Sequence, residues 1–227
     1  MKDSPGFLVN RILAPYLSEA VRLLLEGCSI EDVDRAMTEF GMPVGPIALL
    51  DDVGLDVAAK AGEVLQAAFP ERMQAGEDTR LVAAGRLGRK TGKGFYDYEN
   101  GKRREPSEKA YEALGVEPKD PAPLSREAIQ TRLTLPMINE AAFCLADGVV
   151  ASPLKLDLAM IFGTGFPPFR GGLLRYADSV GAARIVEQLE SHAARLGPRF
   201  RPAPLLSELA RSGGRFYAET VPQEKTA

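Results

Sequence analysis

The side chains that most often act in catalysis or bind metals are scarce in this sequence of 227 residues. It contains one histidine, His192, and two cysteines. A single histidine excludes zinc sites built on several histidines, including the HExxH motif. His192 stands among polar residues of a late helical stretch without a recognisable nucleophile or acid partner, so we interpret it as a solvated surface side chain. We predict no metal site and assign His192 no catalytic role.

A glycine-rich basic segment, residues 85–98, is the first candidate for binding a ligand. Its sequence, GRLGRKTGKGFYDY, could hold a phosphate through backbone amides and lysines. It does not have the Walker A spacing, and the Gly-x-Gly-x-x-Gly fingerprint of a dinucleotide site does not occur in the chain. We favour a structural turn whose glycines allow positive φ and whose aromatic rings pack on the core, with phosphate contact as the alternative.

Asn10 and the pair Asp51 and Asp52 are the next candidates. The Asn10 amide can offer a donor and an acceptor to a ligand or satisfy a neighbouring backbone group, and residue type alone favours the structural role. Ser4, followed by Pro5, is placed to cap the first helix. Adjacent carboxylates on a helix point about 100° apart, and no third ligand converges with them, so Asp51 and Asp52 are predicted to cap a helix or carry surface charge.

These side chains must be positioned by helices. Apolar residues recur at helical spacing along residues 13–24 and 33–40, and another helix is predicted over about 55–69. Pro15 is predicted to kink the first helix without dividing it. The segment Met42–Pro46 is too rich in proline and glycine for regular structure, so we predict a rigid bend there.

The second half of the chain repeats the first. Residues 11–20 and 132–141 share Arg, Pro, Glu and Ala in register. Later blocks follow in the same order, with Asp34 matching Asp157 and a Gly-x-Pro bend in each half. Ordered markers across several blocks indicate a duplicated helical unit.

The repeat and the intervening composition divide the chain. We predict a first copy at residues 1–100, a surface linker at 101–124 containing one short helix near residues 107–114, and a second copy at 125–217. The polar residues 218–227 are predicted to form a frayed tail.

The composition restricts the class of protein. It is 45% hydrophobic and 26% charged, with a net charge of −3, so it indicates an ordinary globular protein without an electrostatic footprint for nucleic acid. No run of 18 apolar residues and no signal-peptide core is present. Cys28 and Cys144 lie in apolar helical contexts and are interpreted as buried thiols in a reducing compartment. We therefore expect a cytoplasmic protein that neither binds nucleic acid nor inserts into a membrane.

Four ordered motifs resemble the C-terminal domain of 3-hydroxyacyl-CoA dehydrogenases. They are KDSPGFLVNR at residues 2–11, GMPVGP at 41–46, LLDDVGLD at 49–56 and GRKTGKGFY at 88–96. The second copy resembles the extra C-terminal repeat of the fatty-acid oxidation complex alpha-subunit type. The resemblance implies an all-α fold, a duplicated helical domain of the 6-phosphogluconate dehydrogenase C-terminal-like type with little or no β structure, in which the second copy is degenerate.

The same resemblance implies a function. The family oxidises (3S)-3-hydroxyacyl-CoA in fatty-acid β-oxidation with NAD, which a separate N-terminal Rossmann domain binds; that domain also supplies a catalytic His and Glu. We therefore expect no cofactor site in this chain and no activity of the chain alone. The PGFxVNR context carries the family's supporting catalytic Asn onto Asn10. Further substrate contacts are predicted at Pro5, Gly6, Phe7, Met42, Pro43, Gly45 and Pro46.

The partners implied by the resemblance are the acyl-CoA substrate, the Rossmann domain, and either a second copy in a homodimer or a multienzyme complex. The second copy is expected to be structural and to present such a surface. Because Met1 directly precedes the first motif, we expect an expressed fragment or a truncated gene product. The alternative is a stand-alone helical binding or dimerisation module without redox activity.

Overall fold

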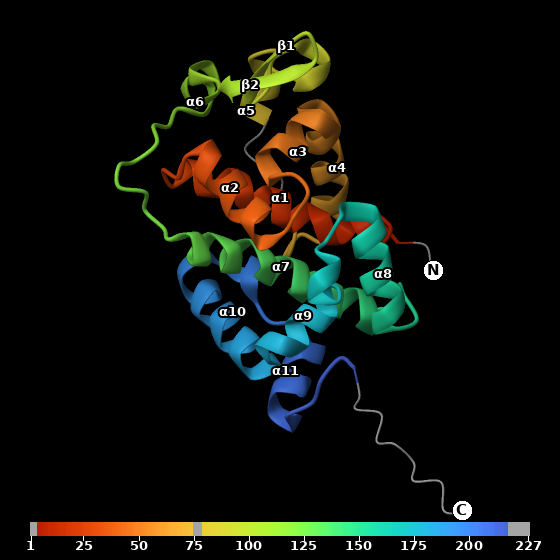
Figure 1. Ribbon diagram of the computed structural model, residues 1–227. Helices are drawn as coiled ribbons and strands as arrows, with labels where there is room; N and C mark the ends of the chain where they lie inside the picture. The colour runs from red at the N-terminus through yellow and green to blue at the C-terminus, as the bar shows by residue number, and fades with distance from the viewer. Residues whose placement is uncertain (1–3, 75–78, 218–227) are drawn as a thin grey trace, which may run out of the picture.

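Two long helices, α1 (Val9–Leu25) and α7 (Arg126–Ala146), pack against each other at the centre of the molecule (Figure 1). They are the corresponding helices of the two copies, and each continues through a proline, Pro15 in α1 and Pro136 in α7. The prediction of one undivided first helix is confirmed. The computed structural model describes residues 4–74 and 79–217, so the predicted frayed tail at 218–227 lies outside the described residues.

Short helices surround each long one. In the first half they are α2 (Ile30–Phe40), α3 (Pro46–Val53), α4 (Leu55–Ala68), α5 (Thr79–Ala83) and the 3₁₀ turn η1 (Arg89–Thr91). In the second half they are α8 (Pro153–Thr164), η2 (Pro168–Arg170), α9 (Leu173–Val180), α10 (Ala182–Leu196), η3 (Pro198–Phe200) and α11 (Pro204–Ser212). Within the described residues, strands occur only in an antiparallel hairpin of β1 (Tyr96–Glu99) and β2 (Lys102–Pro106). The all-α prediction is confirmed.

The segment predicted as a linker contains regular structure. It holds β2 and the helix α6 (Glu108–Leu114), which confirms the short helix expected near residues 107–114. The hairpin joins residues on both sides of residue 100. Further along, the Lys119 amide donates to the Gly27 carbonyl at 2.9 Å, and its ammonium donates to the Glu26 carbonyl at 3.0 Å. The chain leading into α7 is therefore held against the end of α1. The exact division into copies stays a prediction.

Ser4 does not cap the first helix, and that expectation was wrong. Residues 5–8 form turns in which Gly6 and Phe7 have φ of 75° and 52°, so α1 begins only at Val9. The Ser4 hydroxyl instead accepts a hydrogen bond from the Arg11 guanidinium at 3.1 Å. An alanine Cβ at position 6 would lie 2.8 Å from the Leu65 side chain, so glycine allows this segment to pack on α4.

Two reciprocal ion pairs join the copies. Arg11 Nε donates to Glu140 at 2.6 Å, and Arg132 Nε donates to Glu19 at 2.8 Å. In the sequence repeat Arg11 matches Arg132 and Glu19 matches Glu140, so one contact occurs twice with the copies exchanged. All four residues are at most 4% exposed. Burial raises the pKa of Glu140, and the cations of Arg72 and Arg11 oppose that rise.

Outer charges complete each pair. Asp147 accepts from Arg11 at 2.7 Å, and Glu26 accepts from both terminal nitrogens of Arg132, at 2.9 and 2.7 Å. A second arginine reaches each buried glutamate, Arg72 for Glu140 and Arg199 for Glu19. Since buried charges are tolerated only when they are paired and hydrogen-bonded, this network favours one relative placement of the two copies.

Removing one partner tests this role. Arg11→Met should lower the free energy of unfolding by about 3–5 kcal/mol, because the remaining buried carboxylate loses its main cation. The double variant Arg11→Met/Glu140→Met should recover most of that loss. Urea denaturation measures both.

The matched control is Arg35→Met, which removes an exposed pair with Asp32 and should cost less than about 1 kcal/mol. Equal losses for Arg11→Met and Arg35→Met would contradict the assignment.

Candidate functional site

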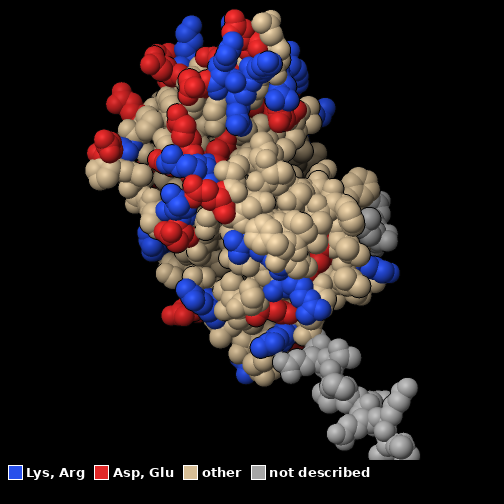
Figure 2. Space-filling model, viewed as in Figure 1, with Lys and Arg blue, Asp and Glu red and all other residues tan. Residues whose placement is uncertain are grey.

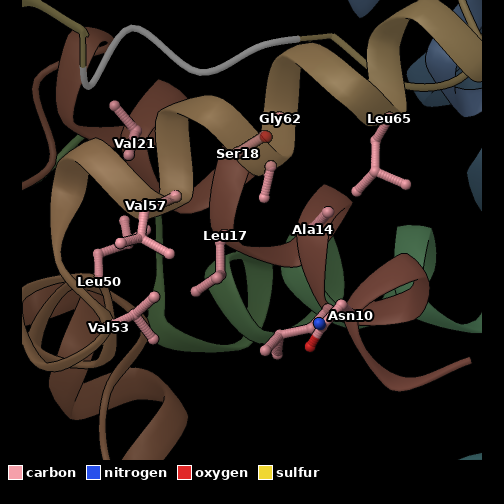
Figure 3. A pocket seen from close by; sticks show the side chains of 13 residues that line it. Asn10, Ala14, Leu17, Ser18, Val21, Leu50, Val53, Val57, Gly62 and Leu65 are labelled. Carbon is pink, nitrogen blue, oxygen red and sulfur yellow. The ribbon is translucent and has the colours of Figure 1, made fainter. Parts of the chain in front are cut away.

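An apolar hollow of about 160 Å³ opens between α1, α3 and α4 of the first copy (Figure 3). We call it the Asn10 hollow. It is lined by Asn10, Leu13, Ala14, Leu17, Ser18, Val21, Leu50, Val53, Val57, Ala58, Ala61, Gly62 and Leu65. Val53 and Val57 are 43% and 52% exposed, so part of its apolar wall faces outward. Most small-molecule sites share this character of a mainly apolar wall with few polar groups.

Asn10 is the polar group at one end of this lining. Figure 3 shows it at the opposite end from Leu50, in the first turn of α1. The side chain is exposed, and its amide makes no hydrogen bond to any described residue. The structural role favoured by residue type alone, satisfying a neighbouring backbone group, is therefore absent within the described part of the chain. Its donor and acceptor are available to a ligand.

The residues before Asn10 lie close to it. A neighbouring hollow is lined by Asn10 and Gly6 together with Asp56 and Lys60. Phe7 is 67% exposed, and Pro5 is exposed as well. Gly6 therefore shares a hollow with Asn10, whereas Pro5 and Phe7 line neither hollow, and their predicted substrate contact stays a prediction.

The bend Met42–Pro46 lies elsewhere. Met42 is 4% exposed in the core, and Pro46 is the first residue of α3. Gly45 packs so closely on Asp34 that an added Cβ would lie 2.2 Å from its carboxyl carbon. Pro43 packs against Gly165 of the second copy. None of these residues lines either hollow, so their predicted substrate contact stays a prediction without support from the lining.

Asp51 holds the glycine-rich segment in place. Its carboxylate accepts hydrogen bonds from the amides of Phe95 and Tyr96, at 2.8 and 2.9 Å, and from the Tyr98 hydroxyl at 3.1 Å. Asp51 is 1% exposed, and burial raises its pKa to about 6. The expectation of a helix cap or surface charge was wrong for Asp51, because the partners come from a segment forty residues away. It was right for Asp52, which is exposed and pairs with an arginine.

The glycine-rich segment is a structural turn, as predicted. Gly88 has φ of 93°, and a Cβ there would lie 2.3 Å from the Asp51 carbonyl oxygen. A Cβ on Gly94 would lie 1.9 Å from the Asp51 carboxylate. Phe95 is fully buried. Three basic side chains of the segment pair with carboxylates, Arg86 with Asp97, Arg89 with Asp52 and Lys90 with Asp56. No observation here favours the alternative of phosphate contact.

The same scaffold occurs in the second copy. Asp34 accepts from the amides of Ile47 and Ala48 and from the Tyr96 hydroxyl. Asp157 likewise accepts from two amides at the start of α9 and from the Tyr217 hydroxyl. These contacts reach Tyr217, the last residue of the predicted second copy.

The sequence itself contains the residues that correspond at the ends of the two copies. The pair Phe95 and Tyr96 matches Phe216 and Tyr217, whose amides donate to Asp178 at 2.8 and 3.0 Å. Asp178 therefore holds the Phe216–Tyr217 segment in the second copy as Asp51 holds the Phe95–Tyr96 segment in the first.

The counterpart of the Asn10 hollow differs in chemistry. Between α7, α9 and α10 lies a hollow whose lining includes Thr131, which matches Asn10 in the repeat, and the polar residues Tyr176, Arg184 and Gln188. The second copy therefore keeps the scaffold but not the amide or the apolar wall.

His192 is partly buried and packed on an aromatic ring, which corrects our expectation of a solvated surface side chain. Its Nδ1 lies 2.7 Å from the Gln188 carbonyl oxygen, and its ring centroid lies 5.2 Å from that of Phe200. Burial lowers its pKa. The periodicity of α10 did not show that the turn carrying Phe200 folds back over this helix.

Both cysteines are fully buried, as predicted. Burial raises the pKa of Cys28 to about 11 and that of Cys144 to about 12. Both are therefore thiols with little nucleophilic character at neutral pH.

Across residues 4–74 and 79–217, no group of three or more metal-binding side chains is clustered. Over the same ranges, every helix is too short or too polar to span a membrane.

The fold and the hollow define a class of protein: a duplicated all-helical domain in which one copy keeps a candidate ligand site. The model of the family described as 3-hydroxyacyl-CoA dehydrogenase, C-terminal domain, matches residues 6–98 and 129–219. The chain belongs to this family, whose domain it contains twice.

Relatives agree with this assignment. The chain is 47% identical over 220 residues to the fatty acid oxidation complex subunit alpha of Shewanella loihica, and 47% identical over 219 residues to that of Idiomarina loihiensis. Each match covers 96% of this chain but 31% of the relative, so the chain spans about a third of the length of these proteins.

A solved structure shares the fold. The crystal structure of 3-hydroxybutyryl-CoA dehydrogenase from Escherichia coli K12 matches with a TM-score of 0.72 and 26% sequence identity, over 92% of this chain and 61% of that one.

The raised pKa of Asp51 predicts a pH dependence. Because the folded state binds this proton more tightly than the unfolded state, its contribution to stability is present at low pH and is lost as the pH rises through about 6. Relative to Asp51→Asn, the wild-type protein should gain about 2–3 kcal/mol of unfolding free energy between about pH 7 and pH 4. Urea denaturation of both proteins across this range isolates the effect, and a difference that does not change with pH would contradict it.

Proposed function

We propose that this chain is the substrate-binding helical region of an NAD-dependent (3S)-3-hydroxyacyl-CoA dehydrogenase of fatty-acid oxidation. The observation that carries the proposal is the exposed Asn10 amide, without a partner among the described residues, at the end of an apolar hollow. The family and the names of the relatives support it.

In this proposal the hollow and the Asn10 amide bind different parts of the substrate. The apolar wall formed by α1, α3 and α4 takes the acyl part of the substrate, with about 0.8 kcal/mol for each methylene removed from water. The Asn10 NH₂ group donates a hydrogen bond to a substrate oxygen, and its carbonyl oxygen can accept one from the hydroxyl that is oxidised. Together they orient the polar end of the substrate beside the hollow.

The described residues do not fit NAD. Their strands form one two-stranded hairpin, and the chain has no glycine fingerprint that could hold a pyrophosphate at a strand-to-helix turn. We therefore assign NAD, and the acid–base residues of the reaction, to a separate Rossmann domain that meets this chain near Asn10. This chain binds and orients the substrate.

The proposal also covers the cellular compartment and the assembly of the protein. The buried thiols of Cys28 and Cys144 fit a reducing compartment, and we place the protein in the cytoplasm. The relatives are subunits of a complex by name, so assembly into a multienzyme complex or a homodimer is part of what we propose.

Asn10→Ala tests the role of the amide. In a protein that also contains the Rossmann domain, this change should lower the rate of NADH-linked acetoacetyl-CoA reduction about 10- to 100-fold, the value of a hydrogen bond of about 1.5–3 kcal/mol. The melting temperature should stay unchanged, because Asn10 is exposed and unpaired within the described structure.

Thr131→Ala, at the matching position of the second copy, is the control and should leave the rate unchanged. If Asn10→Ala lowered the melting temperature as well as the rate, the loss of activity would follow from a structural role of Asn10, and the proposed contact with substrate would be contradicted.

The chain by itself is expected to show no NADH-linked reduction of acetoacetyl-CoA. A spectrophotometric assay of the purified chain, with and without an added Rossmann domain of a relative, measures this directly. Turnover without the added domain would overturn the assignment of NAD and the acid–base groups to a separate domain.

A further inference from the structure

The hollow of the second copy occupies the place that matches the Asn10 hollow of the first. It opens between α7, α9 and α10 and measures about 310 Å³. We call it the Arg184 hollow. It is lined by Thr131, Thr134, Leu135, Ile138, Tyr176, Ser179, Val180, Arg184, Ile185 and Gln188. Apart from Tyr176 and Ser179, every one of these residues matches, in the repeat, a residue that lines the Asn10 hollow.

The register of this match is fixed by residues outside the two hollows. Arg11 of α1 matches Arg132 of α7, and their ion pairs cross between the copies. Gly54 and Gly181 directly precede α4 and α10, with φ of 95° and 93°. The two hollows therefore lie at equivalent positions of the duplicated fold, and their linings can be compared residue by residue.

The lining changes from apolar to polar between the copies. Val57 and Ala61 of α4 correspond to Arg184 and Gln188 of α10, and Asn10 corresponds to Thr131. None of the described residues that line the Arg184 hollow is acidic. The second copy therefore offers a hollow with a cation and no carboxylate of its own.

Four side chains of this lining carry hydrogen-bond donors for which no described residue is an acceptor. They are the Arg184 guanidinium, the Gln188 amide and the hydroxyls of Tyr176 and Thr131. The guanidinium and the amide NH₂ can only donate, and the two hydroxyls can donate as well. Several donors without acceptors in one hollow indicate a ligand that supplies acceptor oxygens.

The position of Arg184 in α10 also indicates an anion. Arg184 is the third residue of this helix, and a cation in the first turn is unfavourable because the helix dipole is positive there. In the first copy the same turn of α4 carries Asp56, the sign of charge that the dipole favours, whereas the first turn of α10 has no acidic residue. An anion in the hollow would interact favourably with both the guanidinium and the end of the helix.

Exposed arginines elsewhere in the molecule have carboxylate partners. Figure 2 shows Lys and Arg interspersed with Asp and Glu on the face that it draws. Arg35, Arg89 and Arg126 are exposed, and each pairs with an aspartate or a glutamate. Arg184 is exposed as well but forms no ion pair within the described chain. Its charge is available to an anion from outside.

The donor set favours a phosphate group over a carboxylate. A guanidinium can bind either group through two hydrogen bonds. A phosphate monoester has three terminal oxygens, so it can also accept from Gln188 and the hydroxyls, and it carries more charge toward the end of α10. The hollow is as large as many small-molecule sites, which leaves room for the rest of an organic ligand.

We propose that the Arg184 hollow is a second ligand site, which binds the phosphate group of a small phosphate monoester with Arg184 as its principal cation. The site belongs to the second copy of the repeat and shares no residue with the Asn10 hollow. It does not depend on the function proposed above.

Calorimetric titration of the purified chain with inorganic phosphate, at neutral pH and constant ionic strength, tests the proposal. The wild-type chain should bind phosphate with a Kd of about 1 mM or lower and should bind acetate more weakly. Arg184→Val introduces the residue of the first copy. It should weaken phosphate binding at least about tenfold, because a charge-assisted hydrogen bond is lost.

Arg195→Val is the matched control. Arg195 is an exposed arginine of the same helix and likewise has no ion pair within the described chain, but it lies in the last turn of α10 and outside the hollow. This change should leave the affinity for phosphate unchanged. Phosphate should accordingly raise the melting temperature of the wild-type chain and of Arg195→Val but not that of Arg184→Val. Circular dichroism establishes that both variants keep their helices.

Chemical modification gives an independent measurement. Phenylglyoxal reacts with accessible guanidinium groups, and mass spectrometry locates the modified residue. Phosphate should slow the modification of Arg184 and leave that of Arg195 unchanged.

A wild-type chain without measurable affinity for phosphate overturns the proposal, and so does an affinity for acetate equal to that for phosphate. Equal weakening by Arg184→Val and Arg195→Val, or equal protection of the two arginines, would reduce the effect to the general charge of α10 and would also overturn it.

Discussion

The structure depends on two buried arginine–glutamate pairs that cross between the halves of the chain. Arg11 with Glu140 and Arg132 with Glu19 put four charges where water does not reach. Such charges are costly to bury unless each meets its partner, and each partner here belongs to the other copy. Neither half can therefore bury its central helix alone without leaving a charge uncompensated. The two pairs therefore hold the halves of the chain together and favour one register of α1 on α7.

Buried aspartates fix the shorter helices that pack around α1 and α7. Asp34 fixes the start of α3, and Asp51 at the other end of α3 fixes the turn that leads into the hairpin. Since α3 forms one wall of the Asn10 hollow, these carboxylates hold the candidate site in shape. Asp157 and Asp178 hold α9 in the same way in the second copy. The same arrangement of helices thus carries two different surfaces: an apolar hollow beside the exposed Asn10 amide in one copy, and an exposed apolar row on α8, formed by Leu154, Leu158 and Phe162, in the other.

Much of the fold follows from local sequence. The helical periodicity of α1 and α2, the glycine-rich turn, the helix in the linker and the duplication were all predicted, because spacing, turn chemistry and repeated markers are local properties. The burial of Cys28 and Cys144 followed for the same reason. The errors concern long-range contact. Asp51 looked like a surface carboxylate and His192 like a solvated side chain. Asp51 is buried and His192 is partly buried, each by a segment whose approach no local pattern describes.

The candidate site shows the same division. The sequence by itself determined that Asn10 stands at the start of an amphipathic helix, in a motif that resembles a family of dehydrogenases, and that Arg11 and Glu19 recur in both halves. Only the tertiary structure decided that the Asn10 amide, unpaired among the described residues, lies beside an apolar hollow, that the bend at Met42–Pro46 lies outside it, and that the repeated charges pair between copies. The physical reason is desolvation: whether a polar group is exposed, satisfied or paired depends on which distant surfaces exclude water from it, and that is set by packing and not by neighbours in the sequence.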